Sequence, residues 1–158
     1  MVPETVTPFQ LLRTRLLLFA IGFGRRMTLG ARAAMIDGRR IFLIRHTYVP
    51  GWHMPGGGVE PGETFAQSVE REVVEETGHR LTAPAELFGI YLNAEISRRD
   101  HVALFVCRNF EKEREFRPNH EIAEAGWFDI DALPEGVGRG TRRRLAEIFE
   151  GVQRSDIW

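Results

Sequence analysis

The chain has 158 residues and a formal net charge of −1 at pH 7, with 43% hydrophobic and 27% charged residues. This length and composition are typical of one globular domain with a buried core, and the near-neutral charge favours neither nucleic acid nor an anionic membrane surface as a partner. The single cysteine, Cys107, excludes an internal disulfide and suits a reducing cytoplasm, which is where we expect the protein to act.

The N-terminal segment is the first predicted element. Residues 9–23 (FQLLRTRLLLFAIGF) are rich in leucine and phenylalanine, but two arginines interrupt them, and a membrane span needs about 20 apolar residues. Residues 24–27 (GRRM) make a poor signal-peptide cleavage site. We expect a helical extension over residues 1–27, ahead of a domain at residues 28–158. The helix docks on that domain or on a second subunit in a homodimer; contact with a membrane surface is the alternative.

Two β-rich runs and a long helix follow. Residues 28–36 and 40–45 flank Asp37-Gly38, a hairpin signal because the turn needs a positive φ. A loop rich in proline and glycine spans residues 50–63. The pattern then predicts a helix over residues 65–77, with Thr64 and Gln67 forming a capping box and Gly78 ending it.

The rest of the chain alternates between strands and polar loops before a last helix. We expect strands near residues 86–96 and 101–110, a polar loop at 117–121, a short strand at 126–130, and a helix at 142–152 capped by Thr141. Mixed strands with helices packed outside them predict an α+β fold or an α/β sandwich.

Three glutamates of the predicted helix carry the main functional signal. Glu72, Glu75 and Glu76 stand at i, i+3 and i+4, so their side chains are neighbours beside the apolar stripe. Like charges at this spacing destabilise a helix, and a partly buried carboxylate costs more. A hard divalent cation such as Mg²⁺ would compensate. A solvated acidic face is the plain alternative, but Arg71 among the glutamates and the glycine-rich loop before them favour a binding site.

The stretch from Gly57 to Gly78 resembles the signature of the Nudix hydrolase family. The signature runs glycine, five residues, glutamate, seven residues, Arg-Glu, an apolar residue, any residue, Glu-Glu, any residue, glycine and an apolar residue. The matching positions are Gly57, Glu63, Arg71, Glu72, Glu75, Glu76 and Gly78. Only His79 departs, at the last apolar position, which weakens an expected packing contact. The resemblance covers about residues 28–150 and leaves the N-terminal extension outside.

The resemblance implies an α/β/α sandwich with a mixed sheet and hydrolysis by water of a diphosphate bonded to another group. It implies Mg²⁺ or Mn²⁺ as cofactor, with these ligands: the backbone carbonyl of Gly56 and the carboxylates of Glu72, Glu75 and Glu76. Glu63 and Arg71 would orient the ligands. The general base differs between branches of the family, so Glu72 and Glu121 are both candidates.

The substrate is less determined by the sequence. Arg32 and Arg45 are candidate phosphate contacts, and Trp52 is a candidate for stacking on a base. No marker of an ADP-ribose or dinucleoside polyphosphate branch is evident at residues 95–97. We therefore expect a small-molecule diphosphate as substrate, first of all a nucleoside triphosphate or a nucleotide-sugar, and other diphosphates stay open. The alternative is a module that senses a nucleotide derivative without cutting it, but such modules usually lose the glutamates that this chain keeps.

Two further features have simple structural readings. The histidines show no zinc spacing, so we expect structural roles for them, although His46 and Tyr48 are placed where they could line a pocket mouth. The basic run Arg142–Arg144 reads as a solvated helix face. We expect no nucleic-acid partner.

Overall fold

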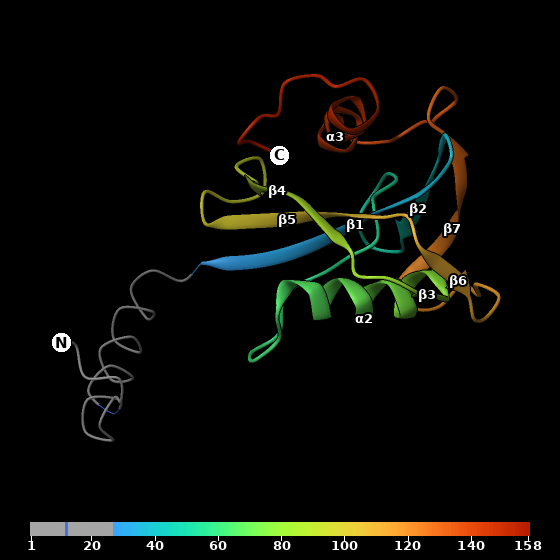
Figure 1. Cartoon of the computed structure of the whole chain (residues 1–158), viewed down its shortest axis with the longest axis horizontal. Helices are drawn as coiled ribbons and strands as arrows, with labels where there is room; N and C mark the ends of the chain where they lie inside the picture. The colour runs from blue at the N-terminus through green and yellow to red at the C-terminus, as the bar shows by residue number, and fades with distance from the viewer. Residues whose placement is uncertain (1–11, 13–26) are drawn as a thin grey trace.

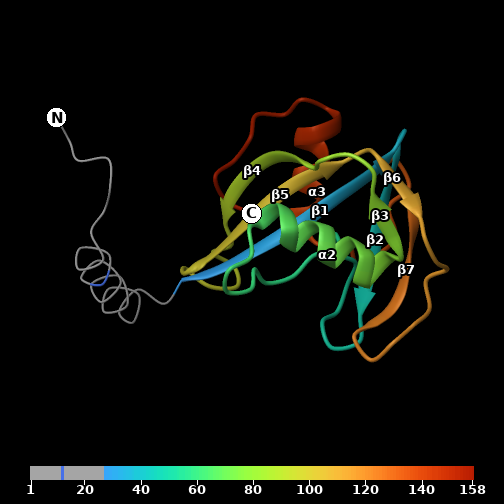
Figure 2. The same cartoon turned by 60° about the horizontal axis from the view of Figure 1, so that its bottom comes forward.

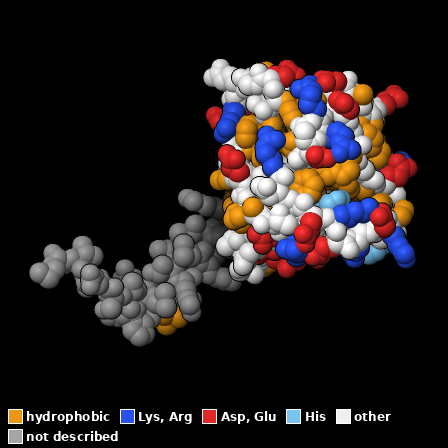
Figure 3. All heavy atoms as spheres, turned by 45° about the vertical axis from the view of Figure 1, so that its right-hand side comes forward, with side chains coloured by type: hydrophobic (Ala, Val, Ile, Leu, Met, Phe, Trp, Pro, Cys, Tyr) orange, Lys and Arg blue, Asp and Glu red, His pale blue; other side chains and the backbone are white. Residues whose placement is uncertain are grey.

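The computed structural model describes Leu12 and residues 27–158. The predicted N-terminal helix, the boundary of the extension and the dimer proposed for it lie outside the described residues. Within the described part of the chain, no helix is long and apolar enough to cross a membrane. Acidic and basic side chains are interspersed over the face shown in Figure 3, as the near-neutral composition leads one to expect.

The domain is built on a mixed five-stranded sheet in the order β4-β5-β1-β2-β7. Its strands are β1 (Thr28–Asp37), β2 (Arg40–His46), β4 (Glu86–Leu92), β5 (Asp100–Cys107) and β7 (Ile122–Asp129). The β1 and β5 strands run parallel, and the other neighbouring pairs are antiparallel. Two short strands, β3 (His79–Leu81) and β6 (Phe110–Lys112), form a separate ribbon that the sequence pattern did not predict.

The helices lie on opposite faces of this sheet (Figures 1 and 2). Helix α2 (Phe65–Thr77) covers one face and helix α3 (Arg139–Phe149) the other. Each face has its own apolar core. On the α2 side it contains Ala31, Met35, Phe42, Ile44, Val69, Val73 and Phe105. On the α3 side it contains Ile36, Leu43, Met54, Tyr91, Leu104 and Leu145. The predicted α/β/α sandwich is therefore confirmed.

The capping and turn residues predicted the bounds of α2 and the position of the first hairpin correctly. The Thr64 side chain accepts a hydrogen bond from the backbone of Gln67, whose side chain accepts one from the Thr64 backbone, so the capping box is present. Gly78 ends the helix with φ 71°, and Gly38 takes φ 59° in the hairpin turn. His79 packs edge-on against Phe42 and other aromatic rings and is buried, so it fills the apolar position.

The glycine-rich loop lies between β1 and β2, where these two strands diverge. The β1 and β2 strands pair directly only beside their turn, at Ile36–Ile41 and Asp37–Arg40. Strand β2 pairs with β7 along its other edge. Beyond the turn, the glycine-rich loop pairs with β1 in the place that β2 would otherwise occupy. The backbone amides of Ala31 and Ala33 donate to the carbonyls of Gly57 and Pro55, at 2.9 and 2.8 Å. This pairing holds the loop beside α2, where the Gly56 amide meets Glu76.

Several predicted boundaries were wrong. Strand β4 ends at Leu92, because the following residues turn and the backbone amide of Asn93 pairs with Asp100. Strand β7 begins at Ile122, earlier than expected. Helix α3 begins at Arg139 after the extended residue Gly138, which provides no side-chain cap. Thr141 is instead a buried residue inside the first turn of α3.

The prediction of a solvated face for the basic run was also wrong for one residue. Arg144 is fully buried, and its Nη2 donates to Glu147 Oε1 at 2.6 Å. Its guanidinium lies 4.1 Å from the centre of the Tyr91 ring. The Tyr91 hydroxyl donates to the other Glu147 oxygen at 3.1 Å. A buried arginine is tolerated here because an opposite charge and an aromatic face replace the water that would otherwise solvate the guanidinium.

Candidate active site

Two of the three helix glutamates face a cavity of about 280 Å³ between α2 and the loops around it. Glu72 and Glu76 are nearly buried in its wall, with 9% and 7% of their surface exposed. Glu75 is not among the lining residues, and its side chain is 61% exposed. The cavity is lined by Arg32, His46, Tyr48, Val49, His53, Gly56, Gly57, Glu72, Glu76 and Glu121. The fold thus joins residues of β1, β2, α2 and two loops.

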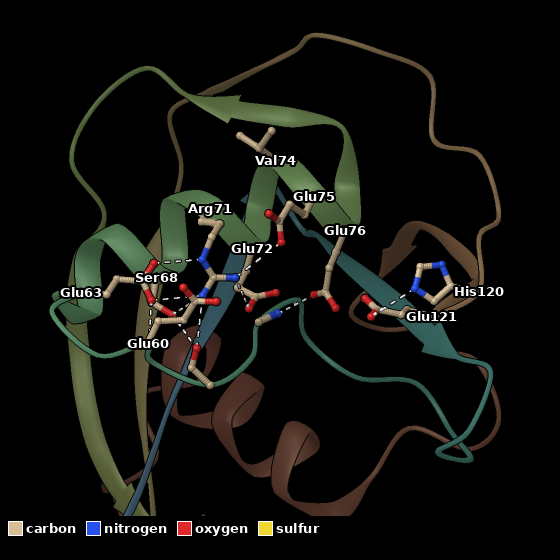
Figure 4. Close-up of polar contacts among 12 residues, drawn as sticks. Glu60, Glu63, Ser68, Arg71, Glu72, Val74, Glu75, Glu76, His120 and Glu121 are labelled. Atoms are coloured by element: carbon tan, nitrogen blue, oxygen red, sulfur yellow. Dashed lines mark hydrogen bonds and ion pairs between the residues drawn. The ribbon is translucent and has the colours of Figure 1, made fainter.

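Arg71 links the glycine-rich loop to the acidic helix (Figure 4). Its Nε and Nη2 donate to the two oxygens of Glu63, at 2.9 and 3.1 Å. Its Nη1 donates to Glu72 Oε1 at 2.8 Å and to Glu75 Oε2 at 3.5 Å. Hydrogen bonding to Arg71 lowers the pKa of Glu63 to about 2. This bidentate pair keeps both partners charged and orients the Glu72 carboxylate.

Glycine is required where the loop meets the carboxylates. A Cβ on Gly57 would lie 2.3 Å from Glu72 Oε1, so any side chain there would displace the carboxylate. Gly56 has φ +138°, and a Cβ on it would lie 2.1 Å from the carbonyl oxygen of Ala31. The backbone amide of Gly56 donates to Glu76 Oε2 at 2.7 Å. The glycines therefore bring backbone donors and acceptors within reach of the buried carboxylates.

Burial makes the charged forms of Glu72 and Glu76 costly. Desolvation, aided by the nearby charge of Glu72 and opposed by the hydrogen bond from the Gly56 amide, raises the pKa of Glu76 to about 7. Desolvation also raises the pKa of Glu72, against the opposing hydrogen bond from Arg71. Two neighbouring, poorly solvated carboxylates favour a bound cation, which would neutralise both.

The donor chemistry of the cavity fits a hard divalent cation. Its walls offer carboxylate and carbonyl oxygens, the ligands that Mg²⁺ prefers. The carboxylates are not gathered into a closed cage: across Leu12 and residues 27–158, no three His, Cys, Asp or Glu side chains form a ready metal cluster. Glu72 is held by Arg71 and Glu76 by the Gly56 amide. The oxygens of the site fit a cation that keeps several water ligands, as Mg²⁺ does.

We expect the raised pKa of Glu76 to appear in the pH dependence of stability. A carboxyl whose pKa is higher in the folded state than in the unfolded state destabilises the fold once it ionises. The metal-free protein should therefore lose stability as the pH rises from the usual pKa of 4.5 through about 7. Glu76→Gln removes this contribution, so melting curves of the two proteins at about pH 5 and about pH 8 isolate it. A stability difference between them that does not change with pH would contradict the assignment.

Of the three residues predicted to contact the substrate, only Arg32 lines the cavity. Arg32 lines the cavity, but its Nη1 donates to the carbonyls of Met54 and Gly56. Arg45 is paired with Glu124 on the surface, and Trp52 packs edge-on against Phe128 with ring centres 4.7 Å apart. Neither Arg45 nor Trp52 is among the residues that line the cavity.

Three other cavity residues are His46, Tyr48 and His53; the sequence suggested a pocket mouth for the first two and a structural role for His53. His46 and Tyr48 have ring centres 5.3 Å apart, and His46 and His53 are 5.7 Å apart, so they form an aromatic wall. Desolvation lowers the pKa of both histidines, which keeps them neutral at pH 7. The Nδ1 atom of His46 is buried without a hydrogen-bond partner. The sequence gave no signal for His53, and it could not show that a β-bulge after Arg45 sets the direction of His46.

Solved structures identify the class of this fold and site. The MutT NUDIX hydrolase from Burkholderia pseudomallei superimposes with a TM-score of 0.66 and 29% identity, covering 77% of this chain and 97% of that one. The chain thus shares the α/β/α sandwich fold of that hydrolase, with a glycine-rich loop that leads into an acidic helix.

Sequence comparison gives the family. Residues 26–148 match the NUDIX domain. A Bacillus subtilis (strain 168) protein named "Putative 8-oxo-dGTP diphosphatase" is 33% identical over 121 residues, 77% of this chain and 78% of that protein. The ADP-ribose pyrophosphatase of Methanocaldococcus jannaschii is 32% identical over 111 residues, 65% of each protein. The chain belongs to the Nudix family and is a Nudix hydrolase.

Proposed function

We propose that this protein hydrolyses a nucleoside diphosphate linked to another group, in a reaction that depends on a divalent metal. The observation that carries the proposal is the convergence of Glu72, Glu76 and Glu121 on one cavity beside a glycine-rich loop. A diphosphate is multiply anionic, so a site rich in carboxylates accepts it only together with cations. The relatives' names support an anhydride of this kind as substrate.

The metal, Mg²⁺ or Mn²⁺, would be held by Glu72 and Glu76, by the carbonyl of Gly56, and by Glu75 from the solvent side. Bound there, it would polarise the phosphate oxygens and lower the pKa of a water ligand. Arg71 and Glu63 keep the Glu72 carboxylate in one orientation. The Gly56 amide does the same for Glu76.

Glu121 is our choice between the two candidates for the general base. Figure 4 shows its carboxylate and that of Glu76 pointing toward each other. Glu72 is engaged by Arg71, whereas the side chain of Glu121 is 60% exposed and, among the residues that the structure describes, its one basic neighbour within 4 Å is the His120 ring, at 3.5 Å. Its backbone amide is fixed by Asn119 Oδ1 at 2.8 Å. Glu121 can therefore take a proton from a water in the cavity without first breaking a bond to arginine.

The aromatic wall indicates which kind of substrate the cavity can bind. Tyr48 is 69% exposed beside the cavity and Val49 is 39% exposed, so a planar ring can pack on them at the rim. The relatives' names include a nucleoside triphosphate and a nucleotide-sugar as substrates. We propose that the substrate of this chain belongs to one of these two groups.

A panel of diphosphates assayed with Mg²⁺ tests the function. We expect cleavage of at least one nucleoside triphosphate or nucleotide-sugar into two phosphate-bearing products, and none in excess chelator. Glu121→Gln should lower kcat by about 10²- to 10⁴-fold, the usual contribution of a general base, while Mn²⁺ affinity stays the same. A purified protein that binds these compounds but leaves all of them intact would support the sensing alternative instead.

A further inference from the structure

The strand β1 holds four consecutive carbonyls of the glycine-rich loop. The backbone amides of Ala33 and Ala31 donate to Pro55 and Gly57, at 2.8 and 2.9 Å. The Nη1 of Arg32 donates to the two carbonyls between and beside them, Met54 at 2.9 Å and Gly56 at 2.7 Å. One side chain thus completes a row of hydrogen bonds that the backbone of β1 makes only at alternate positions.

The peptide at the centre of this row is the one that binds Glu76. The amide of Gly56 donates to Glu76 Oε2 at 2.7 Å, and that peptide's own carbonyl, on Pro55, accepts from Ala33. Arg32 binds the carbonyls of the peptides on either side of it. Because adjacent peptide planes share a Cα, fixing the two flanking planes limits rotation of the central one. The direction of the Gly56 amide therefore depends on Arg32.

We propose that Arg32 is a positioning residue that holds the Gly56 peptide and, through it, the Glu76 carboxylate in place. This role replaces the phosphate contact expected from the sequence. The proposal rests on the proposed function only in taking Glu76 and the Gly56 carbonyl as metal ligands. Groups that orient metal ligands commonly contribute about 10- to 100-fold in metal affinity or activity.

The charge of Arg32 and its hydrogen bonds have opposite effects on metal binding, which makes the proposal testable. A cation in the cavity wall repels a bound metal ion, so removing its charge alone should tighten binding. Removing its hold on the loop should weaken binding. Arg32→Met removes both while keeping an unbranched apolar stem. We expect the substrate-free variant to bind Mn²⁺ about 10- to 100-fold more weakly than wild type, measured by calorimetry.

Arg32→Lys provides a second test of the proposal that does not depend on whether the Arg32→Met variant folds. Lysine keeps the charge, but its shorter side chain and compact ammonium do not reproduce the reach of the guanidinium. We expect a loss of Mn²⁺ affinity of the same sign, because the repelling charge stays while the hold on the loop is weakened, with the KM for substrate within about threefold of wild type. Arg45→Met is the matched control, because Arg45 lies outside the cavity lining and is paired with Glu124. Its Mn²⁺ affinity should equal that of wild type.

Hydrogen exchange of the Gly56 amide gives a second readout that needs no metal. We expect faster exchange in Arg32→Lys than in wild type, and no change in Arg45→Met. Unchanged or tighter Mn²⁺ binding in both Arg32 variants, together with a raised KM, would overturn the proposal and return Arg32 to substrate binding. If wild type binds no metal, the proposed function fails, and the exchange rate alone decides whether Arg32 positions the loop.

Discussion

Glu76→Gln is expected to lower turnover by roughly two orders of magnitude or more and, above about pH 7, to raise the melting temperature of the metal-free protein. The loss of turnover follows because a bound metal supplies several kcal/mol of charge stabilisation in the transition state, and losing a ligand weakens its binding. The gain in stability follows because burial raises the pKa of Glu76 to about 7, and the neutral amide avoids that desolvation. Steady-state kinetics with Mg²⁺ and melting curves in chelator measure the two effects.

The opposite directions of these changes separate a functional carboxylate from a structural one. Glu70→Gln is the matched control, because Glu70 is an exposed glutamate of the same helix, and we expect it to change neither quantity. Glu75→Gln should lower turnover as well, with little effect on stability, since its side chain is 61% exposed. A Glu76→Gln enzyme with near-normal Mg²⁺-dependent turnover would remove Glu76 from the metal site.

Arg144→Met is expected to destabilise the protein by about 3–5 kcal/mol, because it leaves Glu147 charged and buried without its partner. For a domain of this size that corresponds to a fall in melting temperature of roughly 10 °C. The variant also removes the cation from the face of Tyr91 and the hydrogen bond from Nη1 to the Ile157 carbonyl at 2.9 Å. The C-terminal residues should therefore loosen first.

A surface ion pair on the same helix provides the control. Arg139 pairs with Glu95 at 3.4 Å, and its side chain is 86% exposed, so Arg139→Ala should cost at most about 1 kcal/mol. Changing Arg144 and Glu147 together to methionine should recover part of the loss, since no unpaired charge remains. A single Arg144→Met variant as stable as Arg139→Ala would show that the buried pair contributes little.

The arrangement around Glu76 shows how the fold combines opposing requirements. The core stripe of Val69 and Val73 fixes α2 on the sheet and so brings the adjacent carboxylates into a poorly solvated wall. Arg71 and the Gly56 amide satisfy those carboxylates without closing the cavity. The site is thus organised before a metal arrives, and the electrostatic cost of that organisation favours cation binding.

The sequence by itself determined the parts of this protein that depend on short-range rules. The capping box at Thr64, the helix end at Gly78 and the hairpin at Asp37-Gly38 depend on neighbouring residues only, and all three are as predicted. The spacing from Gly57 to Gly78 likewise identified the family, because its residues lie on one loop and one helix.

Only the tertiary structure decided which residues meet across the chain. Arg32 reaches loop carbonyls 22 and 24 residues away, and a β-bulge turns His46 into the cavity wall. Arg144 is buried because Tyr91 and Glu147 come together around it. A basic run or a strand arginine looks the same in sequence whether it faces water or a partner. The free energy of a buried charge depends on the groups that surround it in space, and chain order does not specify those groups.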